Sequence, residues 1–514
     1  MEVSIQQKEN RNVKKLMLRT LLLLLALLTV IPLASCQEAP TPQETDPVTG
    51  PAETDPSTNP STDPEKDPAT DPETDPTEGP VLPEVTFGGS EFTILIRQED
   101  WCVEELYVKE LDTKATSVQR AVYQRTSDVS STYGVIFDVI KDASVASTVA
   151  SAAKGQADAF DLVVDHGRYM FSAAAGKSFY DWNDLPYVDL SADWWSRDAI
   201  REFSTPGGKL FVAVGDISYL SVGNAHALWF NKDMIADVEG LASPYDLVRE
   251  NKWLFDTFEE YAMTLDANLD GDGTGDIATD TFGYSGYGWG VGVQMLYSTG
   301  CKILEWKNED WTFPAKKDMA NEALFDLRDL VYSSGSAILS SHGGGKTAFG
   351  EQRVAFIDGE VHDAMGFAGL DLNYGILPFP KYRKNVKEYY TIVDASTPLF
   401  GVMRNTTAEN AECISIIAEA MAYEGYDKVL PLYYDTVLSY QALKDEDSIE
   451  MLHIIHDSLI WDFGYFYSDA CNVFRDCVID PESGSLLKAV EELEESTRIN
   501  LYEKWNSLDL EEEE

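Results

Sequence analysis

An acidic, glycine-rich stretch at residues 266–280 has the residue types and the spacing of a calcium-binding loop. Its oxygen-bearing side chains occupy every second position: Asn268, Asp270, Asp272, Thr274 and Asp276. Loops of the EF-hand type wrap Ca²⁺ with alternating oxygen ligands and place a glycine at the sharp turn. The bidentate glutamate that completes such a loop is missing, and Asp280 is the nearest carboxylate. We expect a structural Ca²⁺ here, with a metal-free acidic turn as the alternative, and we expect no other cofactor to be required.

Aromatic and polar side chains at other places suit a sugar. A sugar presents an apolar face of C–H bonds and a rim of hydroxyl groups, so it fits a flat aromatic ring surrounded by charged and amide groups. The candidates are Tyr287 and Trp289 in a glycine-rich stretch, Asp165, His166, Arg168 and Tyr169 directly after an apolar run, and Asp216 after a second apolar run. For each aromatic residue, packing in the core is the alternative.

Several patterns that could indicate catalysis fail. Residues 343–347 read Gly-Gly-Gly-Lys-Thr, but Ser340 stands at the first glycine of the phosphate-loop motif, so we interpret the segment as a flexible loop. His453 and His456 lie three residues apart without a partner motif, and Ser221 lies in no Gly-x-Ser-x-Gly turn. We therefore expect no catalytic residue and no enzyme. A surface enzyme acting on glycans is the alternative, because carboxylate pairs are plentiful.

Strand-like and helix-like stretches alternate along the chain around these candidates. Apolar runs predict strands at residues 92–96, 135–140, 160–164, 209–214, 226–230, 353–357 and 373–377. Helical spacing predicts helices at residues 117–133, 143–153, 318–332, 408–423, 448–459 and 485–501. Strands that alternate with helices are typical of an α/β fold with parallel strands, whose ligands lie beyond the carboxyl ends of the strands.

The N-terminus has the organisation of a secretory signal. Lys14, Lys15 and Arg19 precede an apolar run that ends in Leu-Ala-Ser before Cys36. This ending resembles the lipobox of bacterial lipoproteins, which implies that Cys36 is diacylated, becomes the mature N-terminus and anchors the protein to the outside of a cell membrane. A plain signal peptide and an uncleaved anchor helix are the alternatives.

Residues 37–86 predict a disordered spacer between this anchor and a folded region. Thr-Asp-Pro recurs there, acidic residues dominate, and almost nothing apolar is available for burial. Proline interrupts helices and sheets and like charges repel, so the segment should be extended and semi-stiff.

Composition limits the partners and the redox chemistry. The 514 residues carry a net charge of -49, and such a surface repels nucleic acid and anionic lipid, so we exclude nucleic-acid partners. With 44% hydrophobic residues the chain can bury a large core, and its length suggests more than one domain. Apart from Cys36, five scattered cysteines show neither a disulfide framework nor a metal-binding spacing.

Four stretches, taken together with their order, resemble the extracellular solute-binding proteins of ABC importers, of the maltose-binding kind. They are Leu-Trp-Phe-Asn-Lys-Asp at residues 228–233, Lys-Trp at 252–253, the loop 270–273 that leads to Phe-Gly at 282–283, and Gly-Ile-Leu-Pro-Phe-Pro-Lys at 375–381. The resemblance covers residues 88–504. One departure concerns the pocket: the family usually carries an aromatic residue after the glycine that corresponds to Gly359, where this chain has Glu360 and Val361.

The resemblance implies an α/β, two-lobed periplasmic-binding-protein-like fold of type II, with the ligand in a cleft between the lobes. Lobe 1 would comprise residues 87–225 and 391–425, lobe 2 residues 226–390, and residues 426–510 would form C-terminal helices packed across both. It also implies a monomer that captures a small solute, most suitably a sugar or oligosaccharide, and passes it to the membrane subunits of an ABC permease. An orphan binding or sensor lipoprotein is a further alternative.

Overall fold

The computed structural model describes residues 79–99, 103–155, 159–273, 275–288, 290–443, 445–467, 470–480 and 486–510. The signal segment with Cys36, the spacer up to residue 78, Thr274 and Trp289 lie outside the described residues. The described residues all belong to one compact unit, Pro76–Glu514. Of the described helices, none has the length and apolar character needed to cross a membrane.

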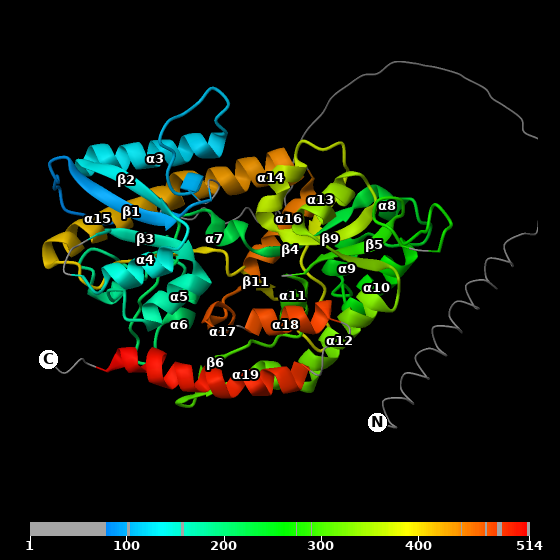
Figure 1. Ribbon diagram of the computed structural model, residues 1–514. Helices are drawn as coiled ribbons and strands as arrows, with labels where there is room; N and C mark the ends of the chain where they lie inside the picture. Colours follow the sequence, from blue (N-terminus) through cyan, green and yellow to red (C-terminus); the bar gives the residue numbers. More distant parts are fainter. Residues whose placement is uncertain are drawn as a thin grey trace, which may run out of the picture. The chain divides into compact units, whose positions relative to one another are not determined.

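A four-stranded sheet with its helices forms the part that we call the first lobe (Figure 1). Its strands, in spatial order, are β12 (Pro398–Gly401), β3 (Leu162–His166), β1 (Ser90–Arg97) and β2 (Val135–Asp142). β1 is parallel to β2 and β3, and β12 is antiparallel to β3. The helices of this lobe are α3 (Ser117–Tyr133), α4 (Val145–Ala152), α5 (Gly167–Ala175), η1 (Trp182–Asp184), α6 (Arg197–Phe203), α7 (Leu220–Gly223) and α15 (Ala408–Glu424).

A five-stranded sheet forms the second lobe. Its order is β10 (Tyr374–Leu377), β4 (His226–Asn231), β9 (Val354–Glu360), β5 (Phe282–Tyr287) and β8 (Ala337–Ser340). β5 is parallel to β8 and β9, so the carboxyl ends of these three strands share one edge. The other elements here are α8 (Lys232–Ala236), α9 (Pro244–Arg249), α10 (Phe255–Thr264), α11 (Val291–Tyr297), β6 (Glu305–Lys307), β7 (Asp310–Thr312), η2 (Pro314–Lys316), α12 (Asp318–Tyr332), α13 (His342–Gly350), η3 (Val361–Asp363) and α14 (Ala364–Phe367).

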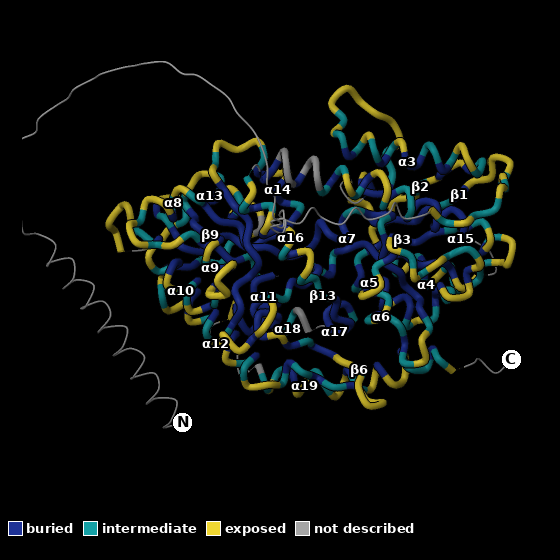
Figure 2. The backbone as a smooth tube through the Cα atoms, turned by 180° about the vertical axis from the view of Figure 1, so that it is seen from behind, coloured by how far each residue is buried: buried dark blue, intermediate teal, exposed yellow. Residues whose placement is uncertain are grey.

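The burial of strands and helices explains why their apolar spacing could be recognised in the sequence. β4 and β9 are buried over their whole length, and Figure 2 shows the central strands of both sheets as buried and the outer loops as exposed. α12 spans the predicted residues 318–332, and its buried side chains recur at helical spacing on one face. An amphipathic stripe of this kind stabilises a helix mainly by packing against the sheet.

Two sequence predictions about local structure are wrong. Residues 209–214 form no strand; the segment is apolar and buried, but its only β-bridge is between Ala213 and Phe400, so burial alone produced the strand-like pattern. The glycine-rich residues 343–347 form no flexible loop but lie in α13. The Ser341 side chain accepts a hydrogen bond from the Gly344 backbone at 3.1 Å, and such a cap favours helix initiation despite the glycines.

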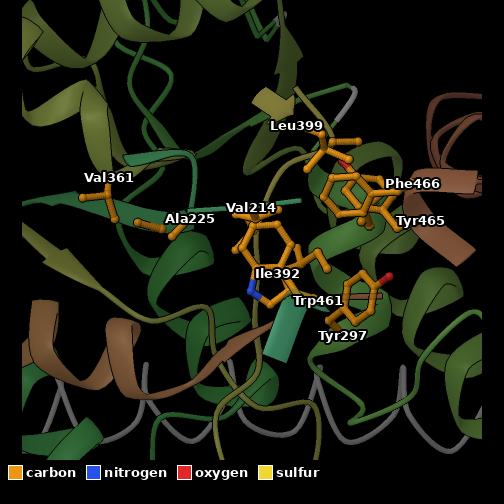
Figure 3. Packing of buried hydrophobic residues seen from close by; sticks show 14 of the residues in the cluster. Val214, Ala225, Tyr297, Val361, Ile392, Leu399, Trp461, Tyr465 and Phe466 are labelled. Atoms are coloured by element: carbon orange, nitrogen blue, oxygen red, sulfur yellow. The ribbon is translucent and has the colours of Figure 1, made fainter. Parts of the chain in front are cut away.

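Crossing segments connect the two lobes. Ala225 forms an antiparallel bridge with Val393, and Asp394 donates its backbone N–H to the Asn224 carbonyl at 2.9 Å. Val361 donates to the Ala225 carbonyl, also at 2.9 Å, and Figure 3 shows Ala225 and Val361 side by side. β11 (Thr391–Ile392) continues the connection by pairing with β13 (Leu459–Ile460). The lobes are thus joined by narrow, hydrogen-bonded segments of extended chain.

The C-terminal part contacts both lobes. It comprises η4 (Gly425–Val429), η5 (Leu432–Leu443), α16 (Glu446–Asp457), α17 (Phe463–Tyr467), α18 (Ala470–Ile479), α19 (Leu486–Asn500), η6 (Leu501–Trp505) and η7 (Asn506–Asp509). In the first lobe, Phe466 packs so closely on Gly167 that a Cβ there would lie 2.2 Å from its ring, and Figure 3 shows Phe466 beside Leu399. In the second lobe, the Tyr297 hydroxyl donates to Asp462 at 2.7 Å.

Candidate functional site

Two of the predicted ligand residues stand at the carboxyl end of β3. Asp165 is buried and accepts a hydrogen bond from the His166 backbone at 2.7 Å. Burial raises the pKa of Asp165 to about 6, although the charge of Arg97 opposes the rise. Burial, with the charge of Arg97, lowers the pKa of His166 to about 4. At neutral pH this strand end therefore offers a carboxylate and a neutral imidazole.

The first turn of α5 carries the other two predicted residues of this group. Tyr169 is half exposed, and its ring lies edge-on to that of His166 with the centroids 5.8 Å apart. Arg168 lies beside it in the same helix turn and is partly buried. The turn thus brings an aromatic ring beside an imidazole, with Arg168 in the same turn, and ligand binding by these residues stays a prediction.

Tyr287 ends β5 in the second lobe. Its backbone N–H donates to Asp358 at 2.6 Å, and burial raises the pKa of Asp358 to about 7. One of the glycines that follow has a steric reason: a Cβ on Gly290 would lie 2.9 Å from the His226 ring. Only a residue without a side chain lets this loop run so close to the imidazole. Trp289, the predicted sugar floor, lies in this loop but outside the described residues.

A buried to partly buried group of polar residues lies at the crossing. We call it the crossing cluster: His226, Asp358, Glu360, Asp394 and Tyr465. Asp394 accepts hydrogen bonds from the Tyr465 hydroxyl at 2.7 Å and the Ser396 backbone at 2.8 Å, and its carboxylate lies 3.3 Å from His226 Nε2. His226 faces Glu360 across the β4–β9 ladder. The negative charge of Asp394 also acts on His166 of the first lobe and on Tyr287 of the second.

Electrostatics hold the centre of the crossing cluster together. Burial opposes ionisation of Asp394, but the hydrogen bonds from His226, Ser396 and Tyr465 bring its pKa below the ordinary value. Burial likewise opposes charge on His226, yet the hydrogen bond to Asp394 and the neighbouring carboxyl groups raise the pKa of His226. The two side chains therefore favour each other's charged forms.

A cavity of about 800 Å³ opens between the lobes beside this cluster. The first lobe lines it from the segment after β1, the start of α3 and α7, with Glu104, Thr116, Val118, Gln119, Tyr219 and Leu220. The second lobe lines it from α13 to the segment after α14, with Lys346, Thr347, Gly350, Glu351, His362, Asp363, Met365, Gly366, Phe367 and Leu370. We call this space the interlobe cavity; its volume suits a small organic solute.

The surface that lines the interlobe cavity is mostly apolar, and the polar side chains on it form pairs. Lys346 forms an ion pair with Asp363, and His362 Nε2 lies 3.6 Å from the same carboxylate. Across the cavity, Gln119 donates its side-chain amide to Glu104 at 2.9 Å. Sequence reasoning missed these residues: Lys346 lies in the segment interpreted as a flexible loop, and the others belong to no motif. For His362 and Asp363 the signal available was their position shortly after the buried strand β9.

The described contacts of Asp216 are with other segments. Its backbone carbonyl packs against Gly425, where a Cβ would come within 1.8 Å of the oxygen. Burial raises the pKa of Asp216 to about 8. None of the described contacts of Asp216 joins it to the interlobe cavity or to the crossing cluster.

In the acidic loop, the described carboxylates bind the loop's own backbone. Asp280 is buried and accepts from the backbone N–H groups of Leu269 at 2.8 Å and Asp276 at 2.9 Å, while Asp270 accepts from Asp272 at 3.0 Å. Asn268 lies at the start of the loop. No three acidic side chains of its described part bring their oxygens within 4.8 Å of one another. Calcium binding by this loop stays a prediction.

Chelation tests it. If Ca²⁺ binds between the carboxylates, it stabilises only the folded state, and a chelator should lower the melting temperature of protein prepared with Ca²⁺. Asp270→Ala combined with Asp272→Ala should abolish the difference between the chelated and the Ca²⁺-loaded samples. Identical melting curves of wild-type protein with and without Ca²⁺, measured by scanning calorimetry after metal-free preparation, would contradict the calcium prediction.

Comparison with known proteins concerns the fold. None of the protein-family models and none of the curated proteins compared with it matches this sequence. Among solved structures, the maltose/maltodextrin-binding domain MalE from Bdellovibrio bacteriovorus, bound to maltotriose, matches with a TM-score of 0.53 and 14% identity over 80% of this chain and 99% of its own. The cyclic α-maltosyl-1,6-maltose binding protein from Arthrobacter globiformis matches with 0.55 and 13%, over 81% and 100%.

A third match carries a different kind of ligand. UgpB from Mycobacterium tuberculosis, in complex with glycerophosphocholine, has a TM-score of 0.53 and 13% identity over 81% of this chain and 99% of its own. At such identities the likeness concerns the backbone and leaves the ligand open. The chain therefore has the two-lobed, type II periplasmic-binding-protein-like fold of the maltose-binding kind of solute-binding protein.

Proposed function

We propose that the protein is a membrane-anchored extracellular receptor that captures a small carbohydrate and delivers it to an ABC permease. The observation that carries the proposal is the interlobe cavity of about 800 Å³, which is lined from both lobes. A solute that contacts both walls binds the closed arrangement of the lobes more tightly than the open one, so it shifts the population toward closure. The narrow crossing segments allow such a hinge movement.

A carbohydrate is favoured by the chemistry of the cavity and by the fold. Its walls combine apolar side chains such as Met365 and Phe367 with hydrogen-bonding groups such as Gln119 and His362, which suits the mixed surface of a sugar. Two of the matched structures are binding proteins of maltodextrin-like sugars. The residues at the ends of β3 and β5, including Trp289, are proposed to bind the same solute from the crossing side.

The choice between receptor and enzyme has a direct test. Purified protein is screened by thermal shift against neutral oligosaccharides, glycerol phosphodiesters, amino acids and peptides. We expect a neutral oligosaccharide to raise the melting temperature progressively with its concentration and to give a one-to-one calorimetric isotherm without release of sugar. A response to other solutes alone would overturn the carbohydrate proposal, and the appearance of hydrolysis products would support a glycan-active enzyme instead.

The lipid anchor is a separate prediction that concerns Cys36. Cys36→Ser removes the thiol to which the lipobox resemblance assigns the diacylglyceryl group, so the variant should leave the membrane fraction or accumulate as an uncleaved precursor. Fractionation with metabolic fatty-acid labelling measures both outcomes, and Cys413→Ser is the matched control. If Cys36→Ser stays in the membrane fraction and carries label as wild type does, the lipoprotein assignment is wrong.

A further inference from the structure

The crossing cluster has the side chains of a transition-metal site. Three potential ligands come from three separate segments: His226 from β4, Glu360 from the end of β9 and Asp394 from the crossing segment. Their ligand atoms all lie within 4.8 Å of one another. One imidazole and two carboxylates form a mixed nitrogen and oxygen set, and Zn²⁺ is commonly held by histidine and carboxylate in this way.

The distance inside this trio suits two ligands of one ion. His226 Nε2 and Asp394 Oδ2 lie 3.3 Å apart. Two ligands, each about 2.0–2.1 Å from Zn²⁺ at a tetrahedral angle, stand roughly 3.3–3.4 Å from each other. An ion between them takes the place of the proton that now links the two atoms, and that proton leaves to solvent. Glu360 would complete the trio by a small side-chain movement.

The burial of His226 and the negative charges around it also favour a bound cation. His226 is 2% exposed, and its other ring nitrogen, Nδ1, has no hydrogen-bond partner among the described residues. Asp358 is also buried and faces the same place: its carboxylate lies 3.4 Å, and Nδ1 of His226 3.5 Å, from the point that a Cβ on Gly290 would occupy. Several carboxyl groups thus gather around one histidine in a region of low dielectric, where a divalent cation replaces mutual repulsion by attraction.

The neighbouring cavity offers the ion a way in. Glu360 belongs to a second trio, with His362 and Asp363, whose ligand atoms also lie within 4.8 Å of one another. His362 and Asp363 line the interlobe cavity. An ion that enters from the cavity would meet this outer trio first and reach His226 and Asp394 through the shared Glu360.

We propose that His226, Glu360 and Asp394 bind a divalent transition-metal ion of the Zn²⁺ class at the crossing between the lobes. The bound ion ties β4, β9 and the crossing segment together, so it should stabilise the junction on which lobe movement depends. This site is distinct from the acidic loop 266–280 and does not depend on the identity of the solute.

Co²⁺ is the probe, because its visible absorption reports a tetrahedral site. Metal-free, full-length protein is titrated with Co²⁺ in excess Ca²⁺, which occupies the acidic loop, and the Co²⁺ is then displaced with Zn²⁺. We expect one equivalent of Co²⁺ with a tetrahedral spectrum that Zn²⁺ abolishes. Glu360→Gln should weaken binding by at least about a hundredfold, since even outer-shell changes weaken metal binding about 10–100-fold.

Two variants separate this site from surface binding and from misfolding. His456→Gln removes a half-exposed histidine of α16 and should bind Co²⁺ like wild type. Glu360→Gln keeps the shape of the side chain. An apo melting temperature near that of wild type would show that the variant is correctly folded. Wild-type protein without a tetrahedral Co²⁺ spectrum, Glu360→Gln with unchanged affinity, or loss of binding in His456→Gln would each overturn the proposal.

Discussion

Replacing Asp462 by alanine should lower the free energy of unfolding by about 3–5 kcal/mol. Asp462 is fully buried and accepts hydrogen bonds from the Tyr297 hydroxyl at 2.7 Å and from the backbone of Ile303 at 2.5 Å and Gly464 at 2.8 Å. Alanine leaves these buried donors without an acceptor, and each buried unsatisfied group costs about 1–3 kcal/mol. The effect is large because a single carboxylate binds the start of α17 to α11 and to the chain that follows it.

Urea unfolding measures this loss. Asp457→Ala is the matched control, because that carboxylate is 82% exposed and belongs only to a surface pair with His456, so the change should stay within about 0.5 kcal/mol. A decrease below about 1 kcal/mol for Asp462→Ala would mean that water or a rearranged side chain satisfies the donors. The C-terminal segment would then contribute less to the junction than its contacts suggest.

Gly366→Leu should weaken solute binding by at least about a hundredfold, which corresponds to about 2.7 kcal/mol. Gly366 is exposed in α14, lines the interlobe cavity, and a Cβ there meets no atom within 4 Å. The leucine side chain would therefore project into space that the solute needs, while the apo protein has no clash to relieve. Calorimetry with the sugar found in the screen, together with the apo melting temperature, measures the two effects separately.

The matched control lies three residues further along the chain. Gly369 is also exposed and also has no atom within 4 Å of a Cβ, but it does not line the cavity. Gly369→Leu should leave both affinity and melting temperature near the wild-type values. Full affinity in Gly366→Leu together with strong loss in Trp289→Ala would place the solute at the ends of β3 and β5 rather than in the interlobe cavity.

The sequence located some of the candidate ligand residues at the ends of strands. Asp165 and His166 follow the predicted strand 160–164 and form the carboxyl end of β3, so the rule that ligands lie beyond strand ends selected residues near the crossing. Tyr287 was selected from its glycine-rich surroundings, and the structure places it at the end of β5, a strand that the sequence did not predict. The rule could not select Asp394, because the short crossing segment around it has neither helical nor strand periodicity. It also favoured Asp216, whose described contacts lie elsewhere, since a polar residue after an apolar run looks the same whichever way it faces.

Fold and site differ in what determines them. The sequence by itself determined many of the elements and their order, because burial of apolar side chains imposes a period on a helix or strand, as in α12 and β9. Only the tertiary structure decided which polar groups meet. His226 and Asp394 are 168 positions apart, and the cavity joins Glu104 to Lys346 from different lobes. Contacts of this kind depend on how separate segments dock at the crossing, and no local pattern of residues encodes that geometry.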